Sequence, residues 1–301
     1  MGETLKKKIE MLIERGYSQA KIAKLCDISS AALSNYLSGK YEAKDLTSIE
    51  EKIWSGIIIE LDRLDKNNDV ELTYIETKAS KTVENIALIC HVRRRMGLVY
   101  GGAGRGKTRP CKEYARRNKN TLYVKARPSL TARMLVIKIA SLLGCDTKGS
   151  QYNIEEDIIL KLKGSGKLII VDECEHLDHR SLETLRTVIY DEAGCGLLLV
   201  GLESLKFALI GHKGKNEYLS SRCLVNHKIT DLTLKDTENV VKKLFKTASD
   251  SVVKTFHDET EGNMRLLENT VFEVKRLMKI NKQESVTKDM IRFAAGMAVL
   301  K

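Results

Sequence analysis

The octapeptide GGAGRGKT at residues 101–108 limits the folds open to this chain more than any other feature. It follows the apolar run at residues 96–100 and precedes a stretch of helix-forming residues, so it is expected to connect a β-strand to an α-helix. Glycines let the backbone N–H groups of such a turn point inward at a phosphate, where side chains would clash. The pattern G-x-x-x-x-G-K-[ST] therefore predicts a phosphate-binding loop at the edge of an α/β sheet.

The residue types in this loop fit the β- and γ-phosphates of a nucleotide together with a Mg²⁺ ion. We expect the Lys107 ammonium group to reach the β- and γ-phosphates and the Thr108 hydroxyl to bind Mg²⁺. The helix that begins near Gly106 adds the positive end of its dipole. The residues expected to bind the nucleotide are Gly101, Gly102, Ala103, Gly104, Arg105, Gly106, Lys107, Thr108 and Arg109.

The second part of the site is expected at residues 167–173, which read KLIIVDE. A short apolar run that ends in two carboxylates is typical of a buried parallel strand, and ligands of open α/β sheets lie at the carboxyl ends of the strands. We expect Asp172 to hold Mg²⁺ through its water shell and Glu173 to polarise the attacking water. His176 is interpreted as a loop residue, since no partner His or Cys stands at metal-ligand spacing.

The remaining periodic patterns predict the domain organisation. Apolar runs at 122–125 and 196–201 alternate with helical patterns, which predicts a parallel sheet covered by helices on both faces. Beyond Asp231 the patterns are all helical, and we expect a small lid. The expected domains are a small all-α helix-turn-helix domain at 1–66, an α/β ATPase core with a P-loop at 67–231 and a helical lid at 232–301.

Residues 17–40 have the pattern of two short helices joined by a turn at Asp27. Ser18 is expected to cap the first helix and Ser29 or Ser30 the second. The side chains expected to face inward are Ile22, Ala23, Leu25, Leu33 and Leu37. The stretch resembles repressor-type helix-turn-helix proteins, in which the second helix enters the major groove of DNA.

That resemblance implies that the second helix contacts DNA. The implied contacts are Ser30, Ala31, Ser34 and Asn35 at base edges and Lys40 near a phosphate. Such short side chains offer little bidentate reading of bases, so we expect weak sequence specificity. The alternative is a helical bundle that mediates protein contacts only.

The charge of the chain points to an anionic partner. The formal net charge is +11 and the pI is about 9.2, for which nucleic acid is the usual partner and a lysine-rich solvated surface the alternative. Within the ATPase core we expect contacts to double-stranded DNA from Arg116, Arg117 and Lys119, or from Lys213 and Lys215. Contacts to phosphates alone predict a steep salt dependence.

Cysteine spacing and hydropathy predict the compartment. The 7 cysteines are scattered without a C-x-x-C pair, which indicates neither a zinc site nor a disulfide framework. No signal-peptide pattern and no apolar run of about 18 residues is visible. We therefore expect reduced thiols in a cytoplasmic protein that does not associate with membranes.

The P-loop, Asp172-Glu173, the strand that follows and the helical lid together resemble the AAA+ ATPases. The order of the helix-turn-helix, YIET at 74–77, the P-loop, VDE at 171–173 with HL at 176–177, SR at 221–222 and GNMR at 262–265 is similar to the family of phage Mu transposition protein B. The likeness runs over almost the whole chain and is strongest from 74 to 270.

This resemblance implies an ATP-dependent, largely sequence-independent DNA-binding protein that forms homo-oligomeric helical filaments on target DNA. The family delivers this DNA to a DDE transposase, whose contact stimulates ATP hydrolysis. By matching positions, Arg222 is the residue that reaches the γ-phosphate of a neighbouring subunit, and Arg265 is the lid residue that senses the nucleotide. The implied location is the cytoplasm of a bacterial cell, or of the bacterial host of a phage or mobile element.

One position departs from the family pattern. A polar residue usually orients the lytic water after the strand that ends here at Gly201, but Leu202 stands at that position, with Glu203 and Ser204 as possible substitutes. We therefore expect slow hydrolysis that a partner accelerates.

Two other functions are compatible with these patterns. One is a helicase-loader ATPase of DNA replication, and the other is a transcriptional regulator that uses nucleotide as a switch. The helix-turn-helix favours the regulator, whereas the matching blocks through Arg265 favour the transposition protein.

Overall fold

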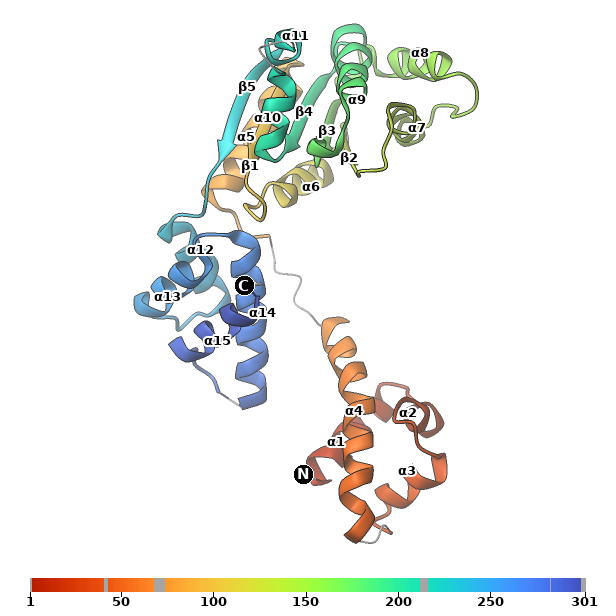
Figure 1. Cartoon of the computed structure of the whole chain (residues 1–301), viewed down its shortest axis with the longest axis vertical. Helices are drawn as coiled ribbons and strands as arrows, with labels where there is room; N and C mark the ends of the chain where they lie inside the picture. Colours follow the sequence, from red (N-terminus) through yellow and green to blue (C-terminus); the bar gives the residue numbers. More distant parts are fainter. Residues whose placement is uncertain (1, 41–42, 68–73, 212–215, 282, 299–301) are drawn as a thin grey trace. The chain divides into compact units, whose positions relative to one another are not determined.

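The structure, a computed structural model, describes residues 2–40, 43–67, 74–211, 216–281 and 283–298. The chain divides into two compact units, Met1–Thr73 and Tyr74–Lys301. Each unit has a buried hydrophobic core of its own. Figure 1 draws the helices and strands of both units. No helix in the described ranges is both long and apolar enough to cross a membrane.

The N-terminal unit is helical. Its helices are α1 (Gly2–Glu14), α2 (Gln19–Leu25), α3 (Ser30–Leu37) and α4 (Ala43–Asn67). The turn between α2 and α3 forms as expected: Ser18 Oγ accepts a hydrogen bond from the Lys21 N–H at 3.2 Å, and Ser29 Oγ accepts one from the Ala32 N–H at 3.1 Å. Asp27 closes the turn in the left-handed region, with φ of 50°.

The buried face of these two helices differs from the expected one at two positions. Leu25 is 36% exposed, because the backbone at the end of α2 packs directly on Gly56, where an added Cβ would lie 2.4 Å from Cys26 Cα. Cys26 enters the core instead. In α3, Tyr36 is 2% exposed while Leu37 is only half-buried. The Tyr36 ring can be buried because its hydroxyl donates to Glu50 Oε1 at 3.0 Å.

The second unit contains a parallel sheet of five strands, which confirms the expected α/β fold. The strand order is β2-β3-β4-β1-β5, and every pairing is parallel. The strands are β1 (Met96–Gly101), β2 (Thr121–Lys125), β3 (Leu168–Asp172), β4 (Gly196–Gly201) and β5 (Cys223–Ile229). β5 was not predicted as a strand from the sequence, because its apolar residues are interrupted by Asn226, His227 and Lys228, which are exposed at this edge of the sheet.

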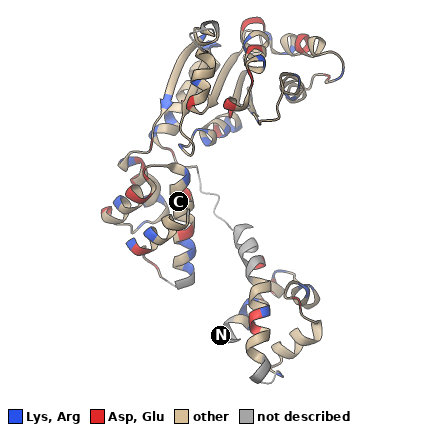
Figure 2. Cartoon of the chain, in the orientation of Figure 1, with Lys and Arg blue, Asp and Glu red and all other residues tan. Residues whose placement is uncertain are grey.

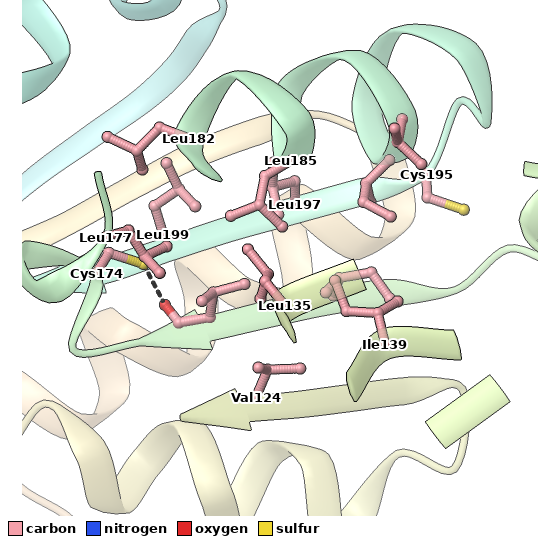
Figure 3. Close-up of a cluster of buried hydrophobic side chains, with 14 of the residues drawn as sticks. Val124, Leu135, Ile139, Cys174, Leu177, Leu182, Leu185, Cys195, Leu197 and Leu199 are labelled. Atoms are coloured by element: carbon pink, nitrogen blue, oxygen red, sulfur yellow. Dashed lines mark hydrogen bonds between the residues drawn. The ribbon is translucent and has the colours of Figure 1, made fainter. Parts of the chain in front are cut away.

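Helices cover both faces of the sheet (Figure 1). On one face, α5 (Lys78–Arg93) and α6 (Thr108–Arg117) pack on Val99, Ile170 and Leu198. On the other face, Leu98, Val171 and Leu199 pack against a larger group of helices, part of which is shown in Figure 3. The elements of this group are α7 (Ala132–Leu143), α8 (Gln151–Leu162), α9 (His179–Thr184), the π-helix η2 (Leu185–Glu192) and α10 (Glu203–Ile210). The continuous apolar runs of β1, β3 and β4 follow from burial on both faces.

A helical lid follows the sheet, as expected. Its helices are α12 (Leu234–Leu244), α13 (Asp250–Thr260), α14 (Met264–Asn281) and α15 (Lys288–Ala298). Thr233 and Asp236 form a capping box at the start of α12, and Asp236 Oδ1 also accepts a hydrogen bond from the Lys78 N–H at 2.7 Å. This bond joins the first residue of α5 to the first turn of the lid. The division of this unit at Asp231 into core and lid remains our proposal.

Candidate nucleotide-binding site

The phosphate-binding loop lies between β1 and α6, at the carboxyl edge of the sheet. Gly104 and Gly106 both have φ of 74°, a conformation that favours glycine. Gly101 is required for another reason: an added Cβ would lie 2.4 Å from the carbonyl oxygen of Ile229 in β5. The glycines therefore serve both the turn and the close packing of the loop on its neighbours.

The Lys107 side chain folds back onto the loop. Its Nζ donates to the carbonyl oxygens of Gly101 at 2.8 Å and Gly102 at 2.7 Å, and the residue is 9% exposed. Burial lowers the pKa of Lys107, while the carboxylates of Glu175 and Asp172 oppose that effect. A buried ammonium held by two carbonyl oxygens can exchange these contacts for phosphate oxygens.

Two carboxylates end β3 beside this loop. Asp172 is 1% exposed, and its Oδ2 accepts a hydrogen bond from the Tyr123 hydroxyl at 2.8 Å while its Oδ1 accepts one from the Glu173 N–H at 2.9 Å. Glu173 adopts φ of 58°, a strained conformation for a residue with a side chain. Its Oε1 lies 3.0 Å from Lys125 Nζ at the end of β2. Strain of this kind is frequent at functional sites.

A third carboxylate, Glu175, lies at the end of β4. Its Oε2 accepts a hydrogen bond from the Leu202 N–H at 3.1 Å, and an added Cβ at Gly201 would lie 2.5 Å from the same oxygen. Glu203, one of the residues expected to substitute for a polar group at Leu202, instead pairs with Lys228 at 2.7 Å, and Ser204 is exposed. The sequence interpretation missed Glu175. The signal that could have found Glu175 is its place just after β3, in the run Asp172-Glu173-Cys174-Glu175.

The start of α14 rests on the phosphate-binding loop. The Arg265 N–H donates to Gly104 O at 3.0 Å, and Asn263 Nδ2 donates to Ala103 O at 3.3 Å. The Arg265 guanidinium is close enough to lower the pKa of Lys107, although burial is the main cause of that shift. The structure thus places Arg265 against the loop, and its role in sensing nucleotide stays a prediction.

Arg105 of the loop and Arg109 of α6 pair with acidic residues at the lid. Arg105 Nε lies 2.7 Å from Asp231 Oδ1, and Arg109 Nη1 lies 2.7 Å from Glu268 Oε1 in α14. Both arginines were expected to bind nucleotide. In this structure their guanidinium groups connect the loop to the lid.

Arg222 is not part of this site within one chain. It precedes β5, and because β5 is parallel to β1, the start of β5 lies at the opposite edge of the sheet from the phosphate-binding loop. Arg222 Nε lies 3.1 Å from Asp191 Oδ1, and Asp191 Oδ2 also binds Arg186 Nη1. This placement separates Arg222 from the nucleotide of its own chain.

The residues expected to contact DNA lie in different environments. Ser30, Ala31, Ser34, Asn35 and Lys40 are all exposed in the N-terminal unit. In α6, Arg116 is bound to Glu113 through two hydrogen bonds of 3.0 and 2.7 Å, and Arg117 lies 2.7 Å from Glu84. Lys119 is exposed and forms no ion pair with the described residues, while Lys213 and Lys215 lie outside the described residues. Because Arg116 and Arg117 are already paired with carboxylates, they are less suited to contact DNA phosphates than Lys119.

The fold and the phosphate-binding loop define an ATPase of the AAA class. Residues 90–209 match the family model described as an AAA domain. The ORC2 protein of Aeropyrum pernix superimposes with a TM-score of 0.58 at 16% identity, over 74% of this chain and 70% of that chain. A RuvB mutant of Thermotoga maritima superimposes with a TM-score of 0.51 at 16% identity, over 74% of this chain and 71% of that chain. These two similarities establish the fold.

Proteins with similar sequences identify the family more narrowly than the similar folds do. DNA transposition protein B of the Mu-like prophage FluMu of Haemophilus influenzae is 30% identical over 261 residues, which cover 84% of this chain and 90% of that protein. The ATP-dependent target DNA activator B of Escherichia phage Mu is 28% identical over 130 residues, 42% of this chain and 41% of that protein. The chain belongs to the family of Mu-like DNA transposition protein B.

Proposed function

We propose that this protein is an ATP-dependent DNA-binding ATPase that assembles on target DNA with little sequence preference and delivers that DNA to a DDE transposase. The observation that carries the proposal is the similarity to the FluMu protein B over 84% of the chain. A complete phosphate-binding loop accompanies it, and its lysine is held in place by two backbone carbonyl groups. The phage Mu relative is named an ATP-dependent target DNA activator, and this name supports ATP as the nucleotide and target DNA as the partner.

The residues at the end of β3 and the start of α6 fit a Mg²⁺ ion bound with the nucleotide. Asp172 is buried with both oxygens hydrogen-bonded, and Thr108 is the first residue of α6. The described residues contain no group of three or more His, Cys, Asp or Glu that could hold a metal. Mg²⁺ is usually bound through few protein ligands, phosphates and water, and a carboxylate and a hydroxyl are oxygen groups of the kind that it takes. Bound there, the ion would neutralise charge on the β- and γ-phosphates.

In the proposed reaction, Lys107 leaves the carbonyl oxygens of Gly101 and Gly102 and binds the β- and γ-phosphates. Glu173 accepts a proton from the attacking water, and Glu175 holds the end of β4 in place through the Leu202 N–H. Arg265 senses the nucleotide from the lid. Without a polar side chain at position 202, the water is poorly oriented, and we expect slow turnover that the transposase accelerates.

Arg222 completes the site of a neighbouring subunit in this proposal. Its position at the edge opposite the phosphate-binding loop is suited to a head-to-tail contact, in which the start of β5 of one subunit faces the nucleotide of the next. Head-to-tail contacts that do not close into a ring form helical filaments. ATP is thereby bound between subunits, and assembly on DNA depends on it. The site of action is the cytoplasm of a bacterium that carries the element.

The proposal is tested by measuring ATP turnover and nucleotide binding with and without nonspecific duplex DNA. Lys107→Ala should abolish nucleotide binding, whereas Glu173→Gln should retain binding and lose about 100-fold or more in turnover. Lys148→Ala, at an exposed loop position, is the matched control and should behave like the parent. Full turnover in Glu173→Gln would reject the role of Glu173, and nucleotide binding by Lys107→Ala would reject the site itself.

A further inference from the structure

A row of basic residues lies at the amino edge of the sheet, opposite the phosphate-binding loop. We define the basic edge as the exposed or half-buried residues Arg93, Arg94, Arg95, Lys119, Lys163 and Lys167. None of them forms an ion pair with any residue in the described part of the chain, in contrast to Arg116 and Arg117 of α6. Lys and Arg occur in both units of the protein (Figure 2), so net charge alone would not single out this edge.

Backbone hydrogen bonds place these residues side by side. The Leu168 N–H donates to Asn120 O at 3.0 Å, and the Gly196 N–H donates to Lys167 O at 3.2 Å. The Leu197 N–H donates to Arg95 O at 3.1 Å. These bonds run across the starts of β2, β3, β4 and β1 in turn, so Lys119, Lys167 and Arg95 follow one another along the edge.

Two of these basic side chains act on the same buried thiol group. Arg94 and Lys167 come from opposite sides of β4, and both lower the pKa of Cys195, which precedes that strand, although burial raises it overall. α5 ends at Arg93, which adds a third consecutive arginine, and Lys163 follows the end of α8. Neighbouring strands are about 4.8 Å apart, so the row from β2 to β1 is about 14 Å long.

Two acidic residues at the end of η2, ahead of β4, interact with groups outside the basic edge. Asp191 at the end of η2 binds Arg186 and Arg222. Glu192, which follows it, raises the pKa of Tyr152 in α8 together with Glu156, the main cause of that shift. Neither of these two carboxylates forms an ion pair with the basic edge.

We propose that the basic edge binds the phosphate backbone of duplex DNA. This rests on the proposed function, in which the start of β5 faces the next subunit, and it assigns the DNA contact of the ATPase core to the rest of the amino edge, from β2 to β1, rather than to α6. Duplex DNA presents one negative charge per about 1.7 Å of its axis, so a row of this length meets several phosphates. Side chains that contact only phosphates do not distinguish bases. Such contacts agree with the weak sequence preference in the proposed function.

The test compares two triple variants with the same change in net charge. Arg94→Gln, Arg95→Gln and Lys167→Gln are combined in the edge variant, and Lys235→Gln, Lys243→Gln and Lys246→Gln in the control. The control lysines are exposed, in or just after α12, and form no ion pair with described residues. Binding to a 30-base-pair duplex is measured by fluorescence anisotropy with ATP and Mg²⁺ at several salt concentrations.

The edge variant should bind about tenfold or more weakly at 0.15 M salt, and its slope of log K against log salt should be shallower by about 0.9 per lost contact. The control should keep the parent slope. A parent slope in the edge variant, with normal DNA binding by the parent, overturns this inference alone, whereas absence of DNA binding by the parent overturns the proposed function too. Loss of ATP-dependent self-association without DNA would assign the edge to subunit contacts and would also overturn it.

Discussion

Lys125 Nζ, at the end of β2, lies 3.0 Å from Oε1 of Glu173, the residue that follows β3. The register of these strands pairs Lys125 with Asp172, so the two side chains meet at the carboxyl edge of the sheet. They are 46% and 35% exposed, and ion pairs this exposed contribute about 1 kcal/mol at most. The pair holds the Glu173 carboxylate beside β2. In the proposed reaction Glu173 must leave this pair to accept a proton, and the pair is weak enough to be exchanged.

Lys125→Met should therefore raise ATP turnover in the absence of DNA. An energy of about 1 kcal/mol limits the increase to about fivefold. The control is Lys138→Met, since the Lys138 ammonium donates to the Lys125 carbonyl oxygen at 2.8 Å and removing it leaves the ion pair to Glu173 in place. Steady-state ATPase assays make the comparison. A fall in turnover in Lys125→Met would mean that the pair supports the reaction.

The contact between Gly104 and Asn263 can be tested by a double-mutant cycle. Gly104→Ala combines a φ of 74° with a Cβ 2.3 Å from Asn263 Oδ1, whereas Gly106→Ala has the same φ and no atom closer than 3.6 Å. Backbone strain alone costs roughly 1–2 kcal/mol. We expect Gly104→Ala to lower the free energy of unfolding more than Gly106→Ala, and Asn263→Ala to remove the difference. Strictly additive effects would show that the loop and the lid are not in contact.

Asp236 couples the lid to α5 in a pH-dependent way. Burial would raise its pKa, but hydrogen bonds from the Lys78 N–H and from Thr233 lower it below its usual value. A depressed pKa stabilises the fold above the unfolded value of about 4, and this stabilisation is lost as pH falls through the folded pKa. Asp236→Asn should cost about 1–2 kcal/mol at pH 7. The difference from the parent should shrink below about pH 4.

Thermal unfolding at pH 7 and at low pH measures this effect. Asp258→Asn is the control, because Asp258 lies in α13, is exposed and forms no ion pair with a described residue, so little change is expected. A difference between Asp236→Asn and the parent that stays constant or grows as pH falls would contradict the assigned hydrogen bonds.

Mixing two inactive variants tests whether Arg222 acts on a neighbouring subunit. Arg222→Ala keeps Glu173, and Glu173→Gln keeps Arg222, so a head-to-tail contact between the two restores one complete site. An equal mixture should recover up to about a quarter of the parent turnover, the statistical share of complete sites in a head-to-tail assembly. Turnover no higher than the average of the separate variants would place the role of Arg222 within its own chain or remove it.

The parts of the structure that could be predicted from sequence are those fixed by local pattern. GGAGRGKT specifies its turn through glycine conformations, and β3 and β4 are continuous apolar runs because both their faces are buried. Serine caps and a left-handed Asp27 likewise depend on neighbours a few residues away.

The features that sequence analysis missed depend on contacts between distant segments. β5 is an edge strand whose exposed side chains hide its pattern. Arg117 finds its partner Glu84 across 33 residues, and Glu175 meets the Leu202 N–H across 27. Lys167 and Arg95 become neighbours only when β3, β4 and β1 align. No spacing rule in a single sequence reveals such pairs.

The central claim is that nucleotide bound between subunits assembles this protein on DNA. The most direct measurement is sedimentation of the full chain with a nonspecific duplex and Mg²⁺, in the presence of ATP, of ADP or of no nucleotide, with electron microscopy of the fast fraction. We predict large protein–DNA assemblies with ATP only, retained by Glu173→Gln and absent in Lys107→Ala. Assemblies that form equally without nucleotide, or the absence of any assembly with ATP, would contradict the claim.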